Sequence, residues 1–415
     1  MIEPLIPEPT GGWLAGRLGY GEAGESLSRH QAALGVRPSG SAEMLRVIEA
    51  SGLRGRGGAG FPTGVKWRAV AQRSRGGAVV LVNGVEADPV SRKDRTLMGS
   101  RPHLVLDGAI IAAESVGAKQ VMVAVNRGAA PARLALASAI KERRERIRIE
   151  LIDVPSRYVA GEETALVQFV NGGPARPTVT PPRPFERGVQ GRPTLVQNAE
   201  TLAWAGLIAR RGHAWFQSLG TPAWPGAVLV TVEGGVPRPG VYELPASATI
   251  VDALAAAGCA DPLVLQAVLA GGYFGAWVAP ADGRLLGEVG AGVIVALPRA
   301  SCGLTETARI MSFLAGESAR QCGPCFNGLP AVASATAQIA VGRARAADLE
   351  RLRRWANQLS GHRGACHHPD GAINLLKSAL RAFEVDLTAH LQRGACRGSQ
   401  APSVLPVAKT SDGWR

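Results

Sequence analysis

The stretch "SGLRGRGGAGFPTGVKW" at residues 51–67 gathers six glycines and three basic side chains into one short segment. Glycine permits positive φ and lets backbone N–H groups come close to phosphate oxygens. Arg54, Arg56 and Lys66 add positive charge, and Phe61 offers a ring for stacking. The segment is not a Walker A loop, because no Gly-Lys-Ser/Thr follows. It predicts a phosphate-binding loop, with a flexible surface loop as the plain alternative.

Apolar strands and helices alternate on the C-terminal side of this loop. The runs at 78–84, 120–126 and 147–154 predict strands, and those at 104–117 and 129–146 predict helices. This alternation is typical of a parallel, doubly wound sheet. The proline-rich segment 173–188 predicts irregular structure that wraps a surface or borders a site.

The sequence pattern changes after residue 226. Strand, Gly/Pro turn and strand follow one another from 227, and a short helix is predicted at 249–259. Helical periodicity dominates from about 301. We therefore expect domains at 1–222, 223–300 and 301–396, followed by a flexible tail at 397–415.

Composition and charge exclude several classes of protein. The net charge is +13, but 40 of the 46 basic residues are scattered arginines without interleaved aromatic residues, so nucleic acid is not predicted as a partner. No apolar run is long enough for direct membrane insertion. The first residues, "MIEPLIPEPTGGW", show no export signal, and six cysteines in 415 residues do not suggest a disulfide scaffold. A cytoplasmic protein is expected.

Four motifs appear in a collinear order. After the glycine loop come "LVNGVEADPVSRKDRTLM" (81–98), "YVAGEETALVQFVNG" (158–172) and "GRPTLVQNAETLA" (191–203). Together they resemble the family of the flavoprotein (51 kDa, NADH-binding) subunit of respiratory complex I and its related diaphorase subunits. The resemblance implies an α/β FMN-binding domain with a Rossmann-like, mostly parallel sheet. It further implies a soluble-ligand-binding β-grasp domain and a C-terminal helical bundle with a [4Fe–4S] cluster.

The resemblance also implies which residues surround FMN. Glycines and Lys66 would hold the phosphate and ribityl chain, while carboxylates and amides would line the flavin, with Glu86 and Glu162 as the catalytic carboxylates. The full implied set is Gly55, Arg56, Gly57, Gly58, Phe61, Lys66, Asn83, Glu86, Gly161, Glu162, Glu163, Gln197 and Asn198. For Glu162 and Glu163 the structural alternative is a helix N-terminus, where acidic residues suit the dipole.

The departures from the family pattern cluster on the nicotinamide side of the implied site. Relatives carry other residues at the positions of Ala69, Val85, Asp88, Thr180, Arg183 and Gln197. NADH or NADPH is the implied substrate, and Arg183 would favour a phosphorylated dinucleotide. Lys93, Asp94 and Arg95 are expected to form a structural salt-bridge corner.

The cysteine pattern is incomplete relative to the family. In "SARQCGPC" (318–325), Ala319 stands where the first cluster ligand is expected. Cys322, Cys325 and Cys366 keep three thiolates, and a [4Fe–4S] cluster normally takes four. Cys396 is the predicted fourth ligand, with His367 and His368 as weaker candidates. A structural zinc site, a thioredoxin-like redox pair and a bundle without a cluster remain alternatives.

The predicted function is an FMN and iron–sulfur oxidoreductase that passes electrons from NAD(P)H to a protein acceptor. A ferredoxin-type or other redox subunit is the expected partner, with a peripheral position on a membrane reductase as a further expectation. One alternative is a ferredoxin-linked flavoprotein that has lost NADH binding. The other is a non-catalytic structural paralogue.

Overall fold

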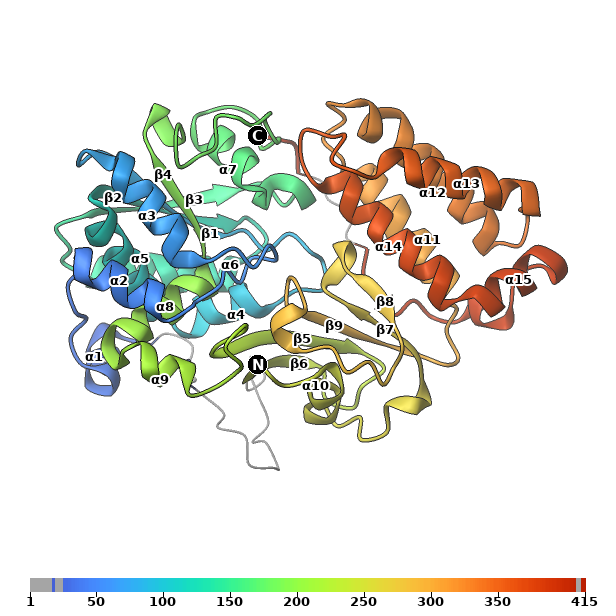
Figure 1. Cartoon of the computed structure of the whole chain (residues 1–415), viewed down its shortest axis with the longest axis horizontal. Helices are drawn as coiled ribbons and strands as arrows, with labels where there is room; N and C mark the ends of the chain where they lie inside the picture. Colours follow the sequence, from blue (N-terminus) through green and yellow to red (C-terminus); the bar gives the residue numbers. More distant parts are fainter. Residues whose placement is uncertain (1–16, 19–24, 408–411) are drawn as a thin grey trace.

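Three structural units follow one another along the long axis of the molecule (Figure 1). The computed structural model describes residues 17–18, 25–407 and 412–415. An α/β unit lies at one end, a five-stranded sheet occupies the middle, and a helical bundle lies at the other end. Within the described part of the chain, no helix has the length and apolar character needed to cross a membrane. The N-terminal segment 1–16 lies outside the described residues.

The first unit is built on a four-stranded parallel sheet with strand order β3-β2-β1-β4. Its strands are β1 (Ala78–Gly84), β2 (Ala118–Asn126), β3 (Arg148–Val154) and β4 (Thr194–Asn198). Its helices are α1 (Leu27–Leu34), α2 (Ala42–Ala50), α3 (Thr63–Ser74), α4 (Lys93–Ser100), α5 (Pro102–Val116), α6 (Ala130–Glu142), α7 (Glu163–Val170), α8 (Ala199–Arg211) and α9 (His213–Gln217).

Both faces of this sheet are covered, which explains the unbroken apolar run of β1. Val80 and Val82 point into the core that contains α5 and α8. Val79 and Leu81 point the other way, into a smaller core that includes residues of α7. Strands buried on both faces read as continuous hydrophobic runs, as expected for parallel sheets with helices on each side.

The strand order reverses between β1 and β4. The chain passes outward from β1 to β2 and β3, then returns to place β4 on the other side of β1. The carboxyl ends of β1 and β4 therefore lie side by side at a topological switch point. Open parallel sheets bind their ligands at such switch points.

The second unit is a mixed sheet with strand order β6-β5-β9-β7-β8. It contains β5 (Ala227–Gly234), β6 (Gly240–Pro245), β7 (Leu265–Ala270), β8 (Ala276–Val278), β9 (Val293–Pro298) and the helix α10 (Ile250–Ala256). Strands β5 and β9 pair in parallel, and the other pairs are antiparallel. One face packs on α10, and the other packs on the helical bundle.

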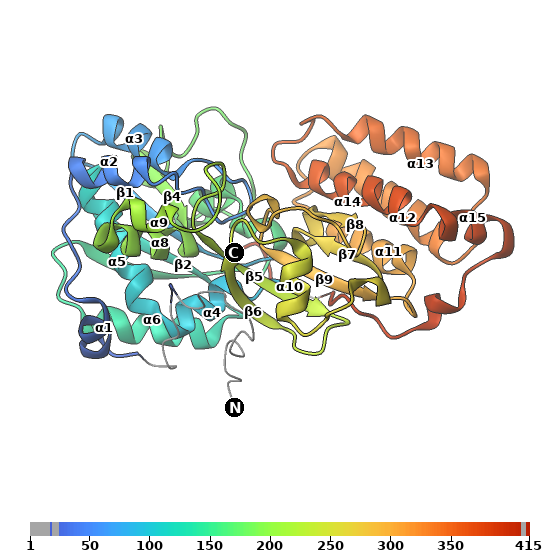
Figure 2. The same ribbon diagram turned by 60° about the horizontal axis from the view of Figure 1, so that its bottom comes forward.

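The third unit consists of α11 (Gly303–Gly316), α12 (Leu329–Ala340), α13 (Ala346–Leu359), α14 (His368–Ala382) and α15 (Glu384–Arg393). In the second view, α13 lies on the outer side of this bundle, away from the sheet (Figure 2). Its core is continuous with residues of β7 and β9. The middle sheet therefore carries the bundle on a hydrophobic face.

The prediction of a flexible tail at 397–415 is wrong for the described part of that segment. Leu405 is buried in the core of the bundle, and the hydroxyl of Tyr273 donates to the carbonyl of Pro406. Farther on, Trp414 lies against the guanidinium groups of Arg157 and Arg176 in the first unit. We call residues 397–407 and 412–415 the C-terminal strap, because they contact the bundle at one end and the α/β unit at the other (Figure 1).

The predicted fold class is confirmed in all three units. The strand at 78–84 matches β1, and the predicted helix at 104–117 matches α5 to within two residues. The strand at 147–154 and the short helix at 249–259 are also present, as β3 and α10. These elements have strong local periodicity, so their existence follows from the sequence.

Candidate functional site

Two asparagines face each other at the switch point of the parallel sheet. Asn83 at the end of β1 and Asn198 at the end of β4 are register partners. Asn83 Nδ2 donates to the carbonyl of Gly161 at 2.8 Å. Asn198 Oδ1 accepts from the backbone N–H groups of Glu200 and Thr201 at 3.0 and 3.3 Å, so it caps the N-terminus of α8. This edge thus joins two strand ends and a helix N-terminus.

The glycine loop lies against the start of α8. Gly55 N donates to the carbonyl of Phe61 at 2.9 Å, which closes the loop, and Arg56 N donates to Thr201 Oγ1 at 2.8 Å. A Cβ atom on Gly57 would lie 3.4 Å from Asn198 Cβ, and Gly58 has a φ of +108°. The loop is therefore in van der Waals contact with β4, and the positive φ at Gly58 favours glycine there.

Lys66 and Glu163 form an ion pair beside this loop. Lys66 Nζ on α3 lies 2.9 Å from Glu163 Oε2 on α7, and Arg183 Nη1 lies 4.0 Å from Glu163 Oε1. All three side chains are partly exposed, and the Phe61 ring is 52% exposed. The proline-rich segment therefore brings Arg183 next to the glycine loop, as expected for a segment that borders a site.

The side chain of Arg56 does not point toward this edge. Its Nη2 donates to the carbonyls of Pro225 and Ala227, at 3.2 and 3.1 Å, and the residue is only 7% exposed. The guanidinium of Arg56 joins the glycine loop to the start of the second unit, so any contribution of Arg56 to the implied FMN site would come from its backbone. Only the backbone of Arg56 remains near α8.

Glu86 organises the loop that follows β1. One of its oxygens accepts from Ser91 Oγ at 2.6 Å and Asp94 N at 3.0 Å. The other accepts from the backbone and side chain of Arg95 at 3.1 and 3.0 Å. Burial opposes ionisation of Glu86, but Arg95 and Lys93 lower its pKa below the ordinary value. The carboxylate is thus ionised and its oxygens already have partners, which gives Glu86 a positioning role in this structure.

The expected salt-bridge corner is confirmed. Lys93 Nζ is buried between Asp94 Oδ1 at 2.8 Å and Glu200 Oε2 at 2.9 Å. Asp94 also accepts a hydrogen bond from Asn198 Nδ2 at 2.8 Å. Glu200 in turn accepts from Leu229 N at 2.9 Å, so the corner connects the switch point to β5.

Glu162 is the N-cap of α7, as the structural alternative expected. Thr164 N, Ala165 N and Thr164 Oγ1 all donate to its Oε2, at 2.9, 3.0 and 2.5 Å. Burial raises the pKa of Glu162 above its ordinary value. The cap leaves Oε1 outside this hydrogen-bond network.

The residues at the switch point fit the phosphate and polar groups of FMN. A Cβ atom on Gly161 would lie 2.9 Å from the carbonyl of Val85, so the segment after β1 packs directly against this glycine. Gln197 is 5% exposed, and its Oε1 has no hydrogen-bond partner among the described residues. A buried orphan acceptor at a strand end is the kind of group that a bound ligand with N–H or O–H donors would satisfy.

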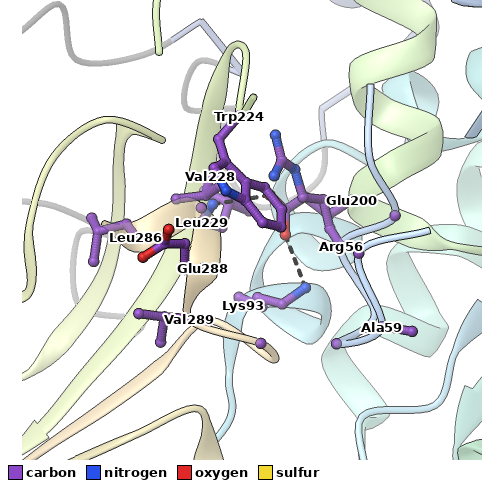
Figure 3. Close-up of a pocket in the computed structure, with 16 residues that line it drawn as sticks. Arg56, Ala59, Lys93, Glu200, Trp224, Val228, Leu229, Leu286, Glu288 and Val289 are labelled. Atoms are coloured by element: carbon purple, nitrogen blue, oxygen red, sulfur yellow. Dashed lines mark hydrogen bonds and ion pairs between the residues drawn. The ribbon is translucent and has the colours of Figure 1, made fainter. Parts of the chain in front are cut away.

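A cavity of about 250 Å³ lies between the glycine loop and the second unit (Figure 3). Its walls come from the loop, from the Lys93–Glu200 pair and from Trp224, Glu288 and Val289 of the second unit. Asn83 and Asn198 do not line it. The cavity is therefore a junction between the first two units, and it adjoins the switch point through the glycine loop and Glu200.

Three cysteines gather where α11 ends and α14 begins. Burial raises the pKa of the Cys325 thiol strongly, and the neighbouring Cys322 and Cys366 raise it further. Burial also raises the pKa of Cys366 to about 11, with a contribution from the Glu162 carboxylate. The three thiols are thus neighbours beside α7. A [4Fe–4S] cluster usually takes four thiolates, and this group could offer three of them. Ala319 is 7% exposed and supplies none.

The prediction that Cys396 completes this group is wrong. Cys396 lies with Cys302 and His390, and their ligand atoms are all within 4.8 Å of one another. Cys302 immediately precedes α11, whereas Cys322 follows its end. The 14 residues of α11 span about 21 Å at 1.5 Å per residue, and His368, two residues after Cys366, contacts the carbonyl of Leu314 near the end of that helix. The two cysteine groups therefore lie at opposite ends of α11. His390 is not predicted as a ligand. The only feature of the sequence that marks it is its position six residues before Cys396.

The two histidines next to Cys366 have different surroundings. His368 is buried, its Nε2 lies 2.8 Å from the carbonyl of Leu314, and burial lowers its pKa to about 4. Its Nδ1 has no hydrogen-bond partner among the described residues. His367 is exposed and lies 3.1 Å, Nδ1 to Nδ1, from His362.

Comparisons with known proteins agree with the division of the chain into three structural units. Family models match residues 48–205 (Nuo51 FMN-binding domain), 229–260 (SLBB domain) and 305–390 (NADH-ubiquinone oxidoreductase-F iron-sulfur binding region). An F-type subunit of the NADH-quinone oxidoreductase of Rhizobium meliloti (strain 1021) is 31% identical over 409 residues, covering 90% of this chain and 96% of that protein. The F-type subunit of the Salmonella typhimurium enzyme is 30% identical over 377 residues, covering 85% of each chain.

A solved structure shows the same fold. An NAD⁺-reducing [NiFe]-hydrogenase in its H₂-reduced state matches with a TM-score of 0.78 and 32% sequence identity over 84% of this chain. The match spans 62% of that hydrogenase chain. Sequence, domain order and fold together place the present chain in the family of the 51 kDa flavoprotein, the F-type subunit of NADH-quinone oxidoreductases.

Proposed function

We propose that this chain is the NADH-oxidising subunit of a larger redox assembly, using FMN in its first unit and an iron–sulfur cluster in its helical unit. One observation carries the proposal: Asn83 and Asn198 are paired at the switch point of the sheet, under a glycine loop and against the capped N-terminus of α8. Parallel α/β sheets bind phosphorylated cofactors at such a position.

Within this site the roles divide between phosphate and ring. Lys66, the N–H groups of the glycine loop and the start of α8 would hold the phosphate, because they combine positive charge with close backbone approach. Asn83, Gln197 and Asn198 would line the ring system with amide groups. FMN, when bound, supplies the conversion between a two-electron hydride and single electrons.

The dinucleotide would enter on the exposed side of the loop. Phe61 presents a half-exposed ring on which a base or nicotinamide can stack. Arg183 is 59% exposed beside Glu163, so it is placed to contact a charged part of the dinucleotide. Val85 and Asp88 stand where relatives carry other residues, and both positions are on this side of the site. The glycines of the loop keep the family pattern.

The cluster region lies close to the flavin edge. The Glu162 carboxylate caps α7 and also raises the pKa of Cys366, so the thiol group and the cap are within electrostatic reach of each other. Cys322, Cys325 and Cys366 would each hold one iron, and the fourth iron would take a ligand other than cysteine. An acceptor protein with its own redox centre, of ferredoxin type or another, would receive the electrons. Six free thiols in the chain suit a reducing cytoplasm.

Anaerobic titration of the full chain, purified with its bound flavin and iron, tests this function. Stepwise addition of NADH should bleach the flavin absorption, and a parallel titration with NADPH measures how far Arg183 sets the dinucleotide preference. Asn198→Ser keeps an N-cap side chain for α8 but removes the amide group, so it should bind less FMN. Thermal unfolding of the same variant measures separately the cost of losing the hydrogen bond to Asp94. A flavin that stays oxidised with both dinucleotides and is reduced by reduced ferredoxin would overturn the proposal.

A further inference from the structure

A buried group of two thiols and one imidazole lies at the far end of the bundle from the three-cysteine group. Cys302 precedes α11, His390 is on α15, and Cys396 follows α15. Cys302 is 2% exposed and His390 is fully buried, whereas Cys396 is half-buried. From these residues we propose a mononuclear zinc site that is separate from the iron–sulfur cluster.

The distances suit a tetrahedral ion. Zinc bonds of about 2.3 Å to sulfur and about 2.0 Å to nitrogen place the two ligand atoms about 3.5 Å apart at a tetrahedral angle. Cys302 Sγ lies 3.7 Å from His390 Nε2, and all three ligand atoms are within 4.8 Å of one another. A small contraction at Cys396 would close the group around one ion.

The imidazole already has the tautomer that a metal requires. His390 Nδ1 lies 3.1 Å from the carbonyl of Ile339, an acceptor that fixes the ring proton on Nδ1. The unprotonated Nε2 therefore carries the lone pair near the thiols; it accepts the backbone N–H of Cys396 at 3.2 Å, and zinc would replace that hydrogen bond. A ligating histidine commonly holds its second nitrogen against a backbone carbonyl in this way.

The donor set selects the class of metal. Two thiolates and an imidazole favour zinc over calcium or magnesium, which prefer oxygen ligands. A cubane cluster binds each thiolate to a different iron, so its ligands must be spread around the cluster, and this group is compact. Ser399 Oγ lies 3.6 Å from Cys396 Sγ, on the partly exposed side, where the hydroxyl or a water can take the fourth position.

The group also extends beyond the matched iron–sulfur region. The family model for that region covers residues 305–390, so it begins after Cys302 and ends before Cys396. Cys322, Cys325 and Cys366 all fall within it. Zinc at the new site would join the beginning of the bundle to its last helix, at the point where the C-terminal strap departs.

Metal analysis of the full chain, purified with its iron–sulfur cluster, tests the proposal. The protein should contain zinc in a molar amount equal to the chain, in addition to iron. Cys302→Ser and Cys396→Ser should each reduce zinc to near background and leave the iron content and the cluster spectrum unchanged. Cys259→Ser is the matched control, because Cys259 is buried in the second unit and belongs to neither group.

A second measurement avoids dependence on variants that fail to fold. In chelator-treated wild-type chain, added Zn²⁺ should slow the alkylation of Cys302 and Cys396 at least several-fold, while Cys259 is unaffected. Zinc content that is unchanged in Cys396→Ser would overturn the proposal. So would iron loss in that variant, a Cys302–Cys396 disulfide in the purified protein, or alkylation rates that do not respond to Zn²⁺.

Discussion

The edge of the parallel sheet and the cysteine-bearing bundle differ in how far the protein alone provides partners for their polar groups. At the sheet edge, Asn83, Asn198 and Lys66 have hydrogen-bond or ion-pair partners within the protein. In the bundle, Cys325 and Cys366 lie in surroundings that disfavour their thiolates, and the position of a fourth ligand is held by Ala319. The first site is built by the fold, whereas the second needs its metal to stabilise the charged ligands.

This difference predicts that the two sites can be lost separately, and the largest effect is expected for the cluster. Cys325→Ser removes one of three thiolates, so iron content should fall to near background while FMN content stays at the wild-type level. Iron and flavin assays on the same purified sample measure both. Cys259→Ser controls for the loss of a buried thiol. Retention of the cluster signal in Cys325→Ser would contradict the ligand assignment.

The converse experiment removes a charge from the flavin edge. A charge-assisted hydrogen bond contributes about 1.5–3 kcal/mol, so Lys66→Met should weaken FMN binding by about 10- to 100-fold. Iron content should be unchanged, and flavin fluorescence during refilling of the apoprotein gives the affinity. Lys119→Met, at an exposed lysine on β2, is the matched control. Equal affinity in both variants would remove Lys66 from the phosphate site.

Placing a cysteine at position 319 should make the cluster site in the bundle more stable. In Ala319→Cys a fourth thiolate becomes available, and the cluster should survive exposure to air several-fold longer than in the wild type. The decay of its visible absorption after aeration is the measurement. Ala315→Cys, one turn earlier on α11, offers a control cysteine that is not at the expected ligand position. An unchanged decay in Ala319→Cys would show that residue 319 does not face the cluster.

The smallest effect is expected for the strap that contacts both regions. Trp414 lies 4.4 and 4.8 Å from the guanidinium carbons of Arg157 and Arg176, and such contacts contribute about 0.5–2 kcal/mol. Trp414→Ala should therefore lower the Tm of the protein by a few degrees. Hydrogen exchange should increase around residues 156–176 and stay unchanged in the bundle. Trp355→Ala, which removes an Arg–Trp contact on α13, should show the reverse pattern.

Features that are set locally or by a motif can be predicted from the sequence. The strand at β1, the helix at α5 and the three-unit order follow from periodicity and from four collinear motifs. The direction of the Arg56 side chain cannot be predicted in this way, because it depends on where residues 225–227 pass beside the loop. The wrong grouping of Cys396 has the same cause: its neighbours are set by how the ends of α11 and α15 meet and not by any local pattern.

The C-terminal strap has a consequence for how the protein is made. The α/β unit is synthesised first and can fold while the bundle is still on the ribosome, since domains generally fold as they emerge. The Asp412 side chain and the Trp414 carbonyl accept hydrogen bonds from Ser156 N and Ala175 N, so these contacts with the first unit form only after the bundle has been synthesised. The first unit therefore folds without them and gains this part of its surface later, when the strap docks on it.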